Sequence, residues 1–217
     1  MPFTARAFLD VFAAYNEALW PLAAVLWLIT AAVAALVMSG RSMWAPLPRL
    51  MLAGHWLWAG LVYHALFFTR INPAAWLFAA LFVAQGLLFI TAASSDRLTA
   101  ARRGSARQAI SSVLIVYSLI YPAVAWADGF AYPRMPTFGV PCPTVILTVG
   151  FLLAASSPSV LLSAVPVAWS LIGGTAAWFF DVHADLVLPA AGALLVADLI
   201  LRRSHVMRKL PLGEKVT

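Results

Sequence analysis

Long stretches without charge constrain this chain more than any other feature of its sequence. Five stretches of 20 or more residues lack Asp, Glu, Lys and Arg, and a sixth is shorter: Ala18–Gly40, Leu50–Thr69, Ile71–Ser95, Gln108–Ala127, Met135–Phe180 and Leu186–Ala197. An apolar helix of about 20 residues matches the hydrocarbon thickness of a bilayer. Only helices and closed barrels satisfy their backbone in lipid, and barrel strands alternate polar with apolar residues. These stretches do not alternate, so we predict an all-α polytopic transmembrane bundle, a single domain over residues 1–217.

Composition supports lipid as the main partner. Hydrophobic residues make up 63% of the chain and charged residues 10%, whereas soluble domains average about 45–50% and about 25%. The net charge of +6 comes from basic residues at the ends of the apolar stretches, where they set topology. We therefore expect no nucleic-acid partner. Cys142 is the only cysteine, so the chain forms no intrachain disulfide.

We expect seven membrane spans. They are placed at about residues 18–39, 48–69, 72–94, 108–127, 142–156, 159–180 and 185–201. The 46-residue stretch Met135–Phe180 is too long for one crossing. It is divided at Pro158, because proline does not continue a helix from the preceding turn. The span 142–156 is short, so a re-entrant hairpin is the alternative.

Basic residues are distributed unevenly between the two sides of the predicted bundle. With seven crossings, 11 of the 14 basic residues share one side: Arg41, Arg49, Arg97, Arg102, Arg103, Arg107, Arg202, Arg203, Arg208, Lys209 and Lys215. Only Arg6, Arg70 and Arg134 lie opposite. The positive-inside rule then places the N-terminus outside and the C-terminus, with the basic tail 202–217, in the cytoplasm.

Two segments on the outer side have patterns of their own. Within residues 1–17, Phe8, Val11, Phe12 and Tyr15 follow i, i+3, i+4, i+7 spacing, which predicts an amphipathic helix on the outer interface. An extension of the first span is the alternative. Residues 128–143 are rich in proline, and we expect them to form a cap loop over the outer end of the bundle.

Polar residues concentrate in the outward half, where we predict a pocket. The candidate lining residues are His64, Tyr63, Asn16, Asn72, Tyr121, Cys142, Thr144, Asp181 and Asp185. Ionisable groups at membrane depth cost free energy and usually face a cavity or a partner. His64 is the strongest candidate, about five residues inside the outer end of its span. His55 lies nine positions earlier, on the opposite face of a straight helix, and is expected to bond a neighbouring helix.

Metal binding is a weaker alternative at two places. Cys142 lies near a helix N-terminus, where a thiolate is favoured. The segment Asp181–Asp185 contains two aspartates and His183, but such short spacing also suits a solvated turn with Asp185 near the N-cap of the next helix. No metal or cofactor is named by these patterns.

Three polar or small-residue features deeper in the bundle predict helix packing. Gln85 is expected to make an interhelical hydrogen bond. Asp198 and Arg202 are spaced for an i, i+4 ion pair. Gly173 and Gly174 predict a close helix contact.

Several short strings together resemble a known family. Tyr15-Asn16 with Trp20-Pro21, Tyr63-His64 with Phe67-Phe68, Ile71-Asn72-Pro73-Ala74 and Phe138-Gly139-Val140-Pro141-Cys142-Pro143-Thr144 are similar to the bacterial inner-membrane family catalogued as domain of unknown function 6064. The resemblance implies a multi-pass protein of the bacterial inner membrane and brings no established activity.

Function is open between three classes. No nucleophile elbow, phosphate loop, HExxH or dinucleotide motif occurs, so we lean away from an enzyme. The leading hypothesis is a transporter or permease for a small solute or ion, with its site in the outward pocket. The alternatives are an intramembrane enzyme or metal-handling protein that uses His64, an aspartate and Cys142, and a membrane sensor or assembly subunit.

Overall fold

A computed structural model of the chain describes residues 3–40, 46–92, 105–155 and 159–209. The described residues are helices joined by short connections, with no strand among them. The helices are α1 Ala5–Ser39, α2 Leu47–Trp58, η1 Ala59–Phe67, η2 Phe68–Arg70, α3 Ala75–Ala92, α4 Ala106–Ala127, α5 Pro141–Ala154, α6 Val160–Phe180, η3 His183–Leu186 and α7 Val187–Lys209. The predicted all-α fold is confirmed.

Six helical segments of the described chain are long and apolar enough to cross a membrane: Ala5–Ser39, Leu47–Arg70, Ala75–Ala92, Ala106–Ala127, Val160–Phe180 and His183–Ser204. The predicted span at 142–156 corresponds to α5, which has 14 residues. At 1.5 Å per residue α5 is about 21 Å long, shorter than a hydrocarbon core of about 30 Å. The count of seven crossings and the orientation of the termini therefore remain predictions.

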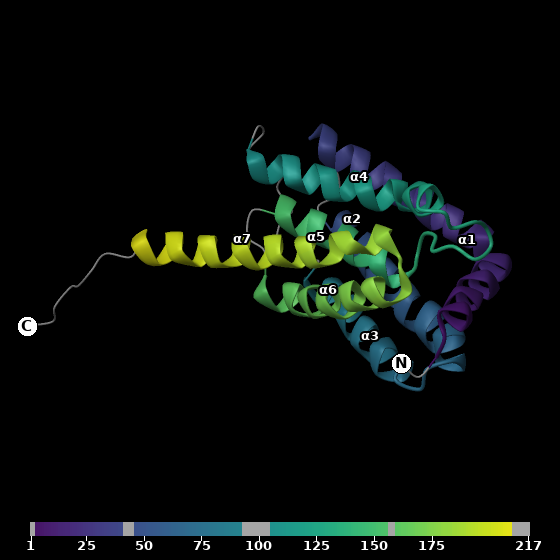
Figure 1. Ribbon diagram of the computed structural model, residues 1–217. Coiled ribbons are helices and arrows are strands. Elements are labelled where there is room, and N and C mark those ends of the chain that lie inside the picture. The colour runs from purple at the N-terminus through teal and green to yellow at the C-terminus, as the bar shows by residue number, and fades with distance from the viewer. Residues whose placement is uncertain (1–2, 41–45, 93–104, 156–158, 210–217) are drawn as a thin grey trace, which may run out of the picture.

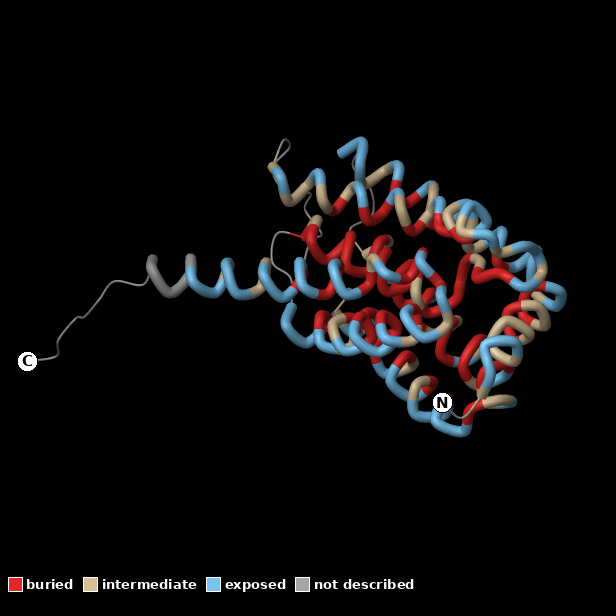
Figure 2. Tube along the Cα trace, viewed as in Figure 1, coloured by how far each residue is buried: buried red, intermediate tan, exposed pale blue. Residues whose placement is uncertain are grey.

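The helix α5 forms the centre of the bundle. Figure 1 shows it enclosed by α2, α4, α6 and α7, and Figure 2 shows it as a nearly continuous buried segment. Twelve of its residues are buried, among them Val145, Ile146 and Leu147 with no exposed surface. Because protein rather than lipid surrounds α5, its length is not set by the thickness of the bilayer.

Connections alternate between the two ends of the bundle. At one end Arg49 Nη1 donates to Ala92 O over 2.8 Å, Arg107 pairs with Asp198 at 3.9 Å, and Arg202 Nη2 donates to Ala155 O over 3.2 Å. We call this the basic end. The other end carries the connections 71–74, 128–140 and 181–182 together with η3, and we call it the pocket end (Figure 1).

The first helix is continuous from Ala5 to Ser39, so the N-terminal segment is an extension of the first predicted span. The helix changes direction along its length (Figure 1), with Pro21 inside it; an internal proline removes a backbone hydrogen bond and kinks a helix. The turns before Pro21 lie against the pocket end, where Val11, Phe12 and Tyr15 are buried. The amphipathic face of this segment thus contacts protein.

Close helix contacts fix the positions of α6 and α7. A Cβ added at Gly174 would lie 2.4 Å from Pro189 Cγ, and one at Gly173 would lie 2.8 Å from Leu188 Cδ1. The predicted close packing at Gly173 and Gly174 is confirmed. Gln85 Nε2 on α3 donates to Leu162 O on α6 over 2.9 Å, as predicted. Asp198 and Arg202 form the predicted ion pair at 2.7 Å.

Candidate functional site

The proline-rich connection 128–140 is tied down by two residues of α1. Asn16 Nδ2 donates to Pro133 O over 2.7 Å and to Met135 O over 2.8 Å, and its Oδ1 accepts from Thr137 at 2.5 Å. Tyr15 donates its hydroxyl to Phe138 O over 3.0 Å. A loop that turns three carbonyls toward buried side chains needs such partners, so the tandem Tyr15-Asn16 holds this loop in place.

Gly139 explains why the loop approaches α1 so closely. It has φ of 83°, a conformation that favours glycine. A Cβ at this position would lie 2.6 Å from the Tyr15 hydroxyl and 2.8 Å from Trp58 Nε1. The loop therefore reaches the interface of α1 and α2 because this residue has no side chain.

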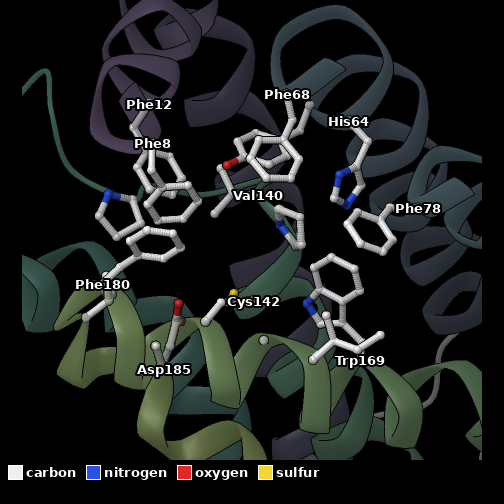
Figure 3. A pocket seen from close by; sticks show the side chains of 18 of the residues that line it. Phe8, Phe12, His64, Phe68, Phe78, Val140, Cys142, Trp169, Phe180 and Asp185 are labelled. Atoms are coloured by element: carbon white, nitrogen blue, oxygen red, sulfur yellow. The ribbon is translucent and has the colours of Figure 1, made fainter. Parts of the chain in front are cut away.

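Beneath this loop lies a pocket of about 210 Å³. Figure 3 shows side chains from α1, η1, η2, α3, α5, α6 and η3 around it. Most are aromatic, including Phe8, Phe68, Phe78, Trp169 and Phe180. The residues with polar side-chain groups that line it are fewer: Tyr63, His64, Asn72, Tyr121, Cys142, Thr175 and Asp185, besides the Trp169 indole nitrogen. A concave, largely apolar site with a few polar groups is the usual form of a small-molecule site.

His64 lies on a helical segment of unusual geometry. The α-helical α2 changes at Ala59 into the π-helix η1, which ends at Phe67. A π-helix has a wider turn than an α-helix and is found often at functional sites. Gly60 permits this segment to lie against α3, since a Cβ there would be 3.0 Å from Ala79 O. Because each turn of η1 contains more residues than a turn of an α-helix, His64 points in a different direction than it would on a continuous α-helix, and here it lines the pocket.

The His64 ring is enclosed by aromatic rings. Five of them lie with centroids 4.8–5.9 Å from it: Phe82, Trp169, Tyr63, Phe78 and Phe68. The residue is 1% exposed, and neither ring nitrogen has a hydrogen-bond partner among the described residues. An unmade hydrogen bond in a buried group costs about 1–3 kcal/mol. The fold therefore leaves this imidazole free to bond something within the pocket.

Asp185 is the only buried carboxylate in the described part of the chain, at 5% exposed. It lies in η3, and its carboxylate accepts a hydrogen bond from the Tyr121 hydroxyl of α4. Tyr117, one turn earlier, donates to the neighbouring Ala184 O over 2.7 Å. The face of α4 that carries both tyrosines thus fixes η3 and aims Asp185 at the pocket (Figure 3). Asp185 lies two residues before α7 begins at Val187, as expected for a residue near that helix start, and its side chain lines the pocket.

Outside the pocket, Asp128 completes the support of η3. It accepts from the His183 backbone nitrogen over 2.8 Å and lies 2.7 Å from His183 Nδ1. Asp181 lies 3.2 Å from His183 Nε2. Both ring nitrogens of His183 are therefore engaged by exposed or partly exposed carboxylates, which is the solvated-turn arrangement.

Cys142 forms the floor of the pocket in the first turn of α5. Its thiol faces the Asp185 carboxylate and the Trp169 indole (Figure 3). The Trp169 nitrogen is a second buried group with no hydrogen-bond partner among the described residues. Pro141 and Pro143 flank the cysteine, and proline has no N–H to donate.

Of the nine predicted pocket residues, the structure brings six together: His64, Tyr63, Asn72, Tyr121, Cys142 and Asp185. Asn16 is buried but binds the loop. Thr144 is buried within α5 and donates back to Val140 O over 2.9 Å. Asp181 faces solvent, with its side chain 88% exposed. These three do not line the pocket.

The polar groups do not assemble into a catalytic relay or a metal site in this conformation. His64 bonds neither Cys142 nor Asp185, whereas a cysteine or carboxylate relay needs that contact. Within the described ranges no three His, Cys, Asp or Glu side chains are close enough to hold a metal ion. What the arrangement does offer is a carboxylate, an imidazole and a thiol facing one enclosed aromatic space.

The aromatic wall is the part of the site that sequence reasoning missed. Trp169, Phe78 and Phe180 come from the middle of α6, the start of α3 and the end of α6. Each lies in an apolar stretch where large rings are common, so nothing marks it as pocket-lining. The one usable signal was Gly173, a full turn after Trp169, because a glycine beside a large ring leaves room on one face of a helix.

Comparison with known proteins gives a family and no function. The family described as "Family of unknown function (DUF6064)" matches residues 5–209. This chain belongs to the DUF6064 family. Searches of curated proteins and of solved structures found no match. The DUF6064 match covers every helix described above and all the residues that line the pocket except Phe3.

Proposed function

We propose that this DUF6064 protein is a small-solute permease of the bacterial inner membrane, with its substrate site in the pocket of about 210 Å³. One observation carries the proposal. Two buried polar side chains line the same enclosed space: His64, which has no hydrogen-bond partner among the described residues, and Asp185, which is a carboxylate. Polar groups of this kind at membrane depth are expensive, and in transporters they mark substrate pathways.

The position of the short helix α5 favours a role in transport over a role in helix packing alone. It begins at the pocket floor and ends at the basic end, beside Arg202. Transporters often place their substrate at the end of a broken or shortened helix, with irregular backbone lining the cavity. The loop 128–140 supplies such backbone here through Pro136 and Val140.

Aromatic side chains at the pocket end give the site a gate. The Phe180 ring stacks with Phe8, with ring centroids 4.6 Å apart, and with Phe3, with ring centroids 5.5 Å apart. These contacts join the N-terminal turns of α1 to the end of α6. If these rings separate, the pocket opens at the pocket end, opposite the basic connections. The positive-inside rule assigns this end to the periplasm.

Uptake by purified protein in liposomes tests the proposal. We expect saturable uptake of a solute that fits the pocket, and its reduction by at least about tenfold in Asp185→Asn, which removes the charge that faces the solute. Asp198→Asn is the matched control, because that carboxylate lies near the basic end of α7. Vesicles that carry no cation, anion or neutral solute of this size above protein-free vesicles would contradict the proposal.

A further inference from the structure

The charge balance of the pocket is one-sided. Asp185 is ionisable and buried, and among the residues that the structure describes no Lys or Arg lines the pocket. A buried charge without a partner is strongly unfavourable. At this site the described residues supply two neutral partners for the carboxylate, the Tyr121 hydroxyl and the Cys142 thiol, and no positive charge.

The described cations at the pocket end are engaged elsewhere. Arg134 pairs with Asp10 at 2.7 Å, and the Arg70 guanidinium lies 5.0 Å from the Phe67 ring centroid. His183 is held between Asp128 and Asp181. Arg6 is exposed and lies outside the pocket lining. None of these groups reaches the Asp185 carboxylate.

The aromatic wall adds to the preference for positive charge. The faces of Phe, Tyr and Trp rings carry partial negative charge and attract cations that lie within about 6 Å. Phe8, Phe68, Phe78, Trp169 and Phe180 surround the same space as Asp185 (Figure 3). Rings grouped around a carboxylate are the arrangement by which proteins recognise substituted ammonium groups.

The start of α5 does not make an anion site. Helix N-termini bind anions through free backbone N–H groups. In the sequence Pro141-Cys142-Pro143 only the middle residue has an N–H, so most of those donors are missing. The partial positive charge that remains at this helix end lies beside Asp185, where it favours the carboxylate rather than an anionic solute.

We propose that the pocket recognises a small organic cation, an ammonium group on a compact apolar body, whose charge lies against Asp185 within the aromatic wall. This inference rests on the proposed function, since it names the class of solute that the same pocket carries. A cavity of about 150 Å³ accommodates benzene, so a pocket of about 210 Å³ accommodates a single ring with a short charged arm. His64 contributes a hydrogen bond to the ammonium N–H or to a polar substituent of the solute.

The single cysteine gives a site-specific assay in the unmodified protein. Cys142 lines the pocket, and no other cysteine is present. The rate of its modification by methyl methanethiosulfonate, a small uncharged reagent, is measured against increasing concentrations of three similar probes. They are benzylammonium, benzyl alcohol and benzoate, which differ in the charge of one group.

We expect benzylammonium to protect Cys142 half-maximally at a concentration at least about tenfold below that of benzyl alcohol, and benzoate not to protect. In Asp185→Asn the advantage of the cation falls by about tenfold or more, because its charge partner is lost, while protection by benzyl alcohol is kept. That retained protection also shows that the variant is folded. Asp198→Asn keeps the selectivity of the wild-type protein.

A second variant keeps the proposal testable if Asp185→Asn does not fold. Phe180→Leu removes one ring and leaves the carboxylate, so protection by benzylammonium should weaken by about three- to tenfold and that by benzyl alcohol should weaken less. Equal or better protection of wild-type protein by benzyl alcohol or benzoate would overturn the cation assignment. If such a neutral or anionic solute is also carried into liposomes, the permease proposal stands and only the cation assignment fails. If no probe protects and no solute is carried, both fail.

Discussion

The two ends of this bundle treat their buried polar groups differently. His55 and His64 lie on the same helical segment, and each is 1% exposed. His55 Nε2 lies 2.6 Å from Thr30 Oγ1 of α1, so the fold provides one partner. Neither nitrogen of His64 has a partner within the described ranges. Side chains of similar burial and the same chemistry thus serve helix packing in one half and remain available in the other.

The same contrast holds for the residues around them. Toward the basic end, Trp56 Nε1 donates to Thr148 Oγ1 over 2.9 Å and Ser111 Oγ donates to Gly150 O over 2.8 Å. At the pocket end, Trp169 is buried, and its indole nitrogen has no hydrogen-bond partner in the described part of the chain. Single atoms away from the pocket, His55 Nδ1, Gln85 Oε1 and Gln108 Oε1, also lack a partner among the described residues, but of the residues with such atoms only His64 and Trp169 line the pocket. Functional sites commonly give up local stability in this way.

The largest expected effect is on the free energy of unfolding, and it compares a substitution in the packed core with one in the pocket wall. Leu147→Ala in α5 removes a side chain with no exposed surface and should lower the free energy of unfolding by about 2–5 kcal/mol. Phe180→Ala, at a wall that already borders a cavity, should cost less than half as much. Equilibrium unfolding in mixed micelles measures both. Equal losses would show that the two halves are packed alike.

Two asparagines at the pocket end give the next contrast. Asn16→Ala leaves the carbonyls of Pro133 and Met135 without their donor and should cost about 2–3 kcal/mol. Asn72 receives only a local bond from Ala74 N at 3.1 Å, so Asn72→Ala should cost about 1 kcal/mol or less. Proteolysis of the loop 128–140 should accelerate in the first variant alone. Cleavage at the same rate in both would mean that Asn16 does not hold the loop.

The two histidines provide a matched pair of substitutions. His55→Phe removes the interhelical bond to Thr30 Oγ1, which keeps only its bond to Leu26 O within α1, and should lower stability by about 1 kcal/mol. His64→Phe replaces an unbonded imidazole among aromatic rings, and stability should stay within about 0.5 kcal/mol of wild type or rise. Thermal unfolding of both proteins measures the difference. A larger loss in His64→Phe than in His55→Phe would reverse the assignment of the two residues.

The smallest effect is expected at the basic end. Asp198 pairs with Arg202 at 2.7 Å, with both side chains partly exposed at 14% and 23%. Solvent screens such pairs, so Asp198→Asn should change stability by no more than about 1 kcal/mol. Repeating the unfolding experiment at high salt checks the cause, because screening should reduce the difference further. A loss that is large and independent of salt would place this pair among the core interactions.

Sequence reasoning reached the helices because the absence of charge over about 20 residues has one physical meaning in lipid. It also reached contacts that depend on one helix, such as Asp198 with Arg202, and contacts that depend on residue size, such as Gly174. It missed the π-helix at Ala59–Phe67, because the α-to-π change follows from packing against α3 rather than from local preference.

For the site, the polarity of a residue predicted well that it lies near the pocket, whereas its position along the predicted span did not predict whether its side chain lines the pocket. Asp181 and Asp185 are equally polar and four residues apart, yet one faces solvent and the other the pocket. The left-handed conformation at Asp181, with φ of 58°, ends α6 and turns the chain so that only Asp185 meets Tyr121. Such a turn depends on contacts from α4, which lies about 60 residues earlier, and no local pattern records it.

Accessibility of Cys142 from each side of the membrane tests the account most directly. A small membrane-impermeant cationic thiol reagent is applied separately to the two faces of oriented vesicles, with and without benzylammonium. The account predicts modification from the side opposite the basic connections and slower modification when the amine is present. Modification only from the side of those connections, or a rate unchanged by the amine, would contradict it.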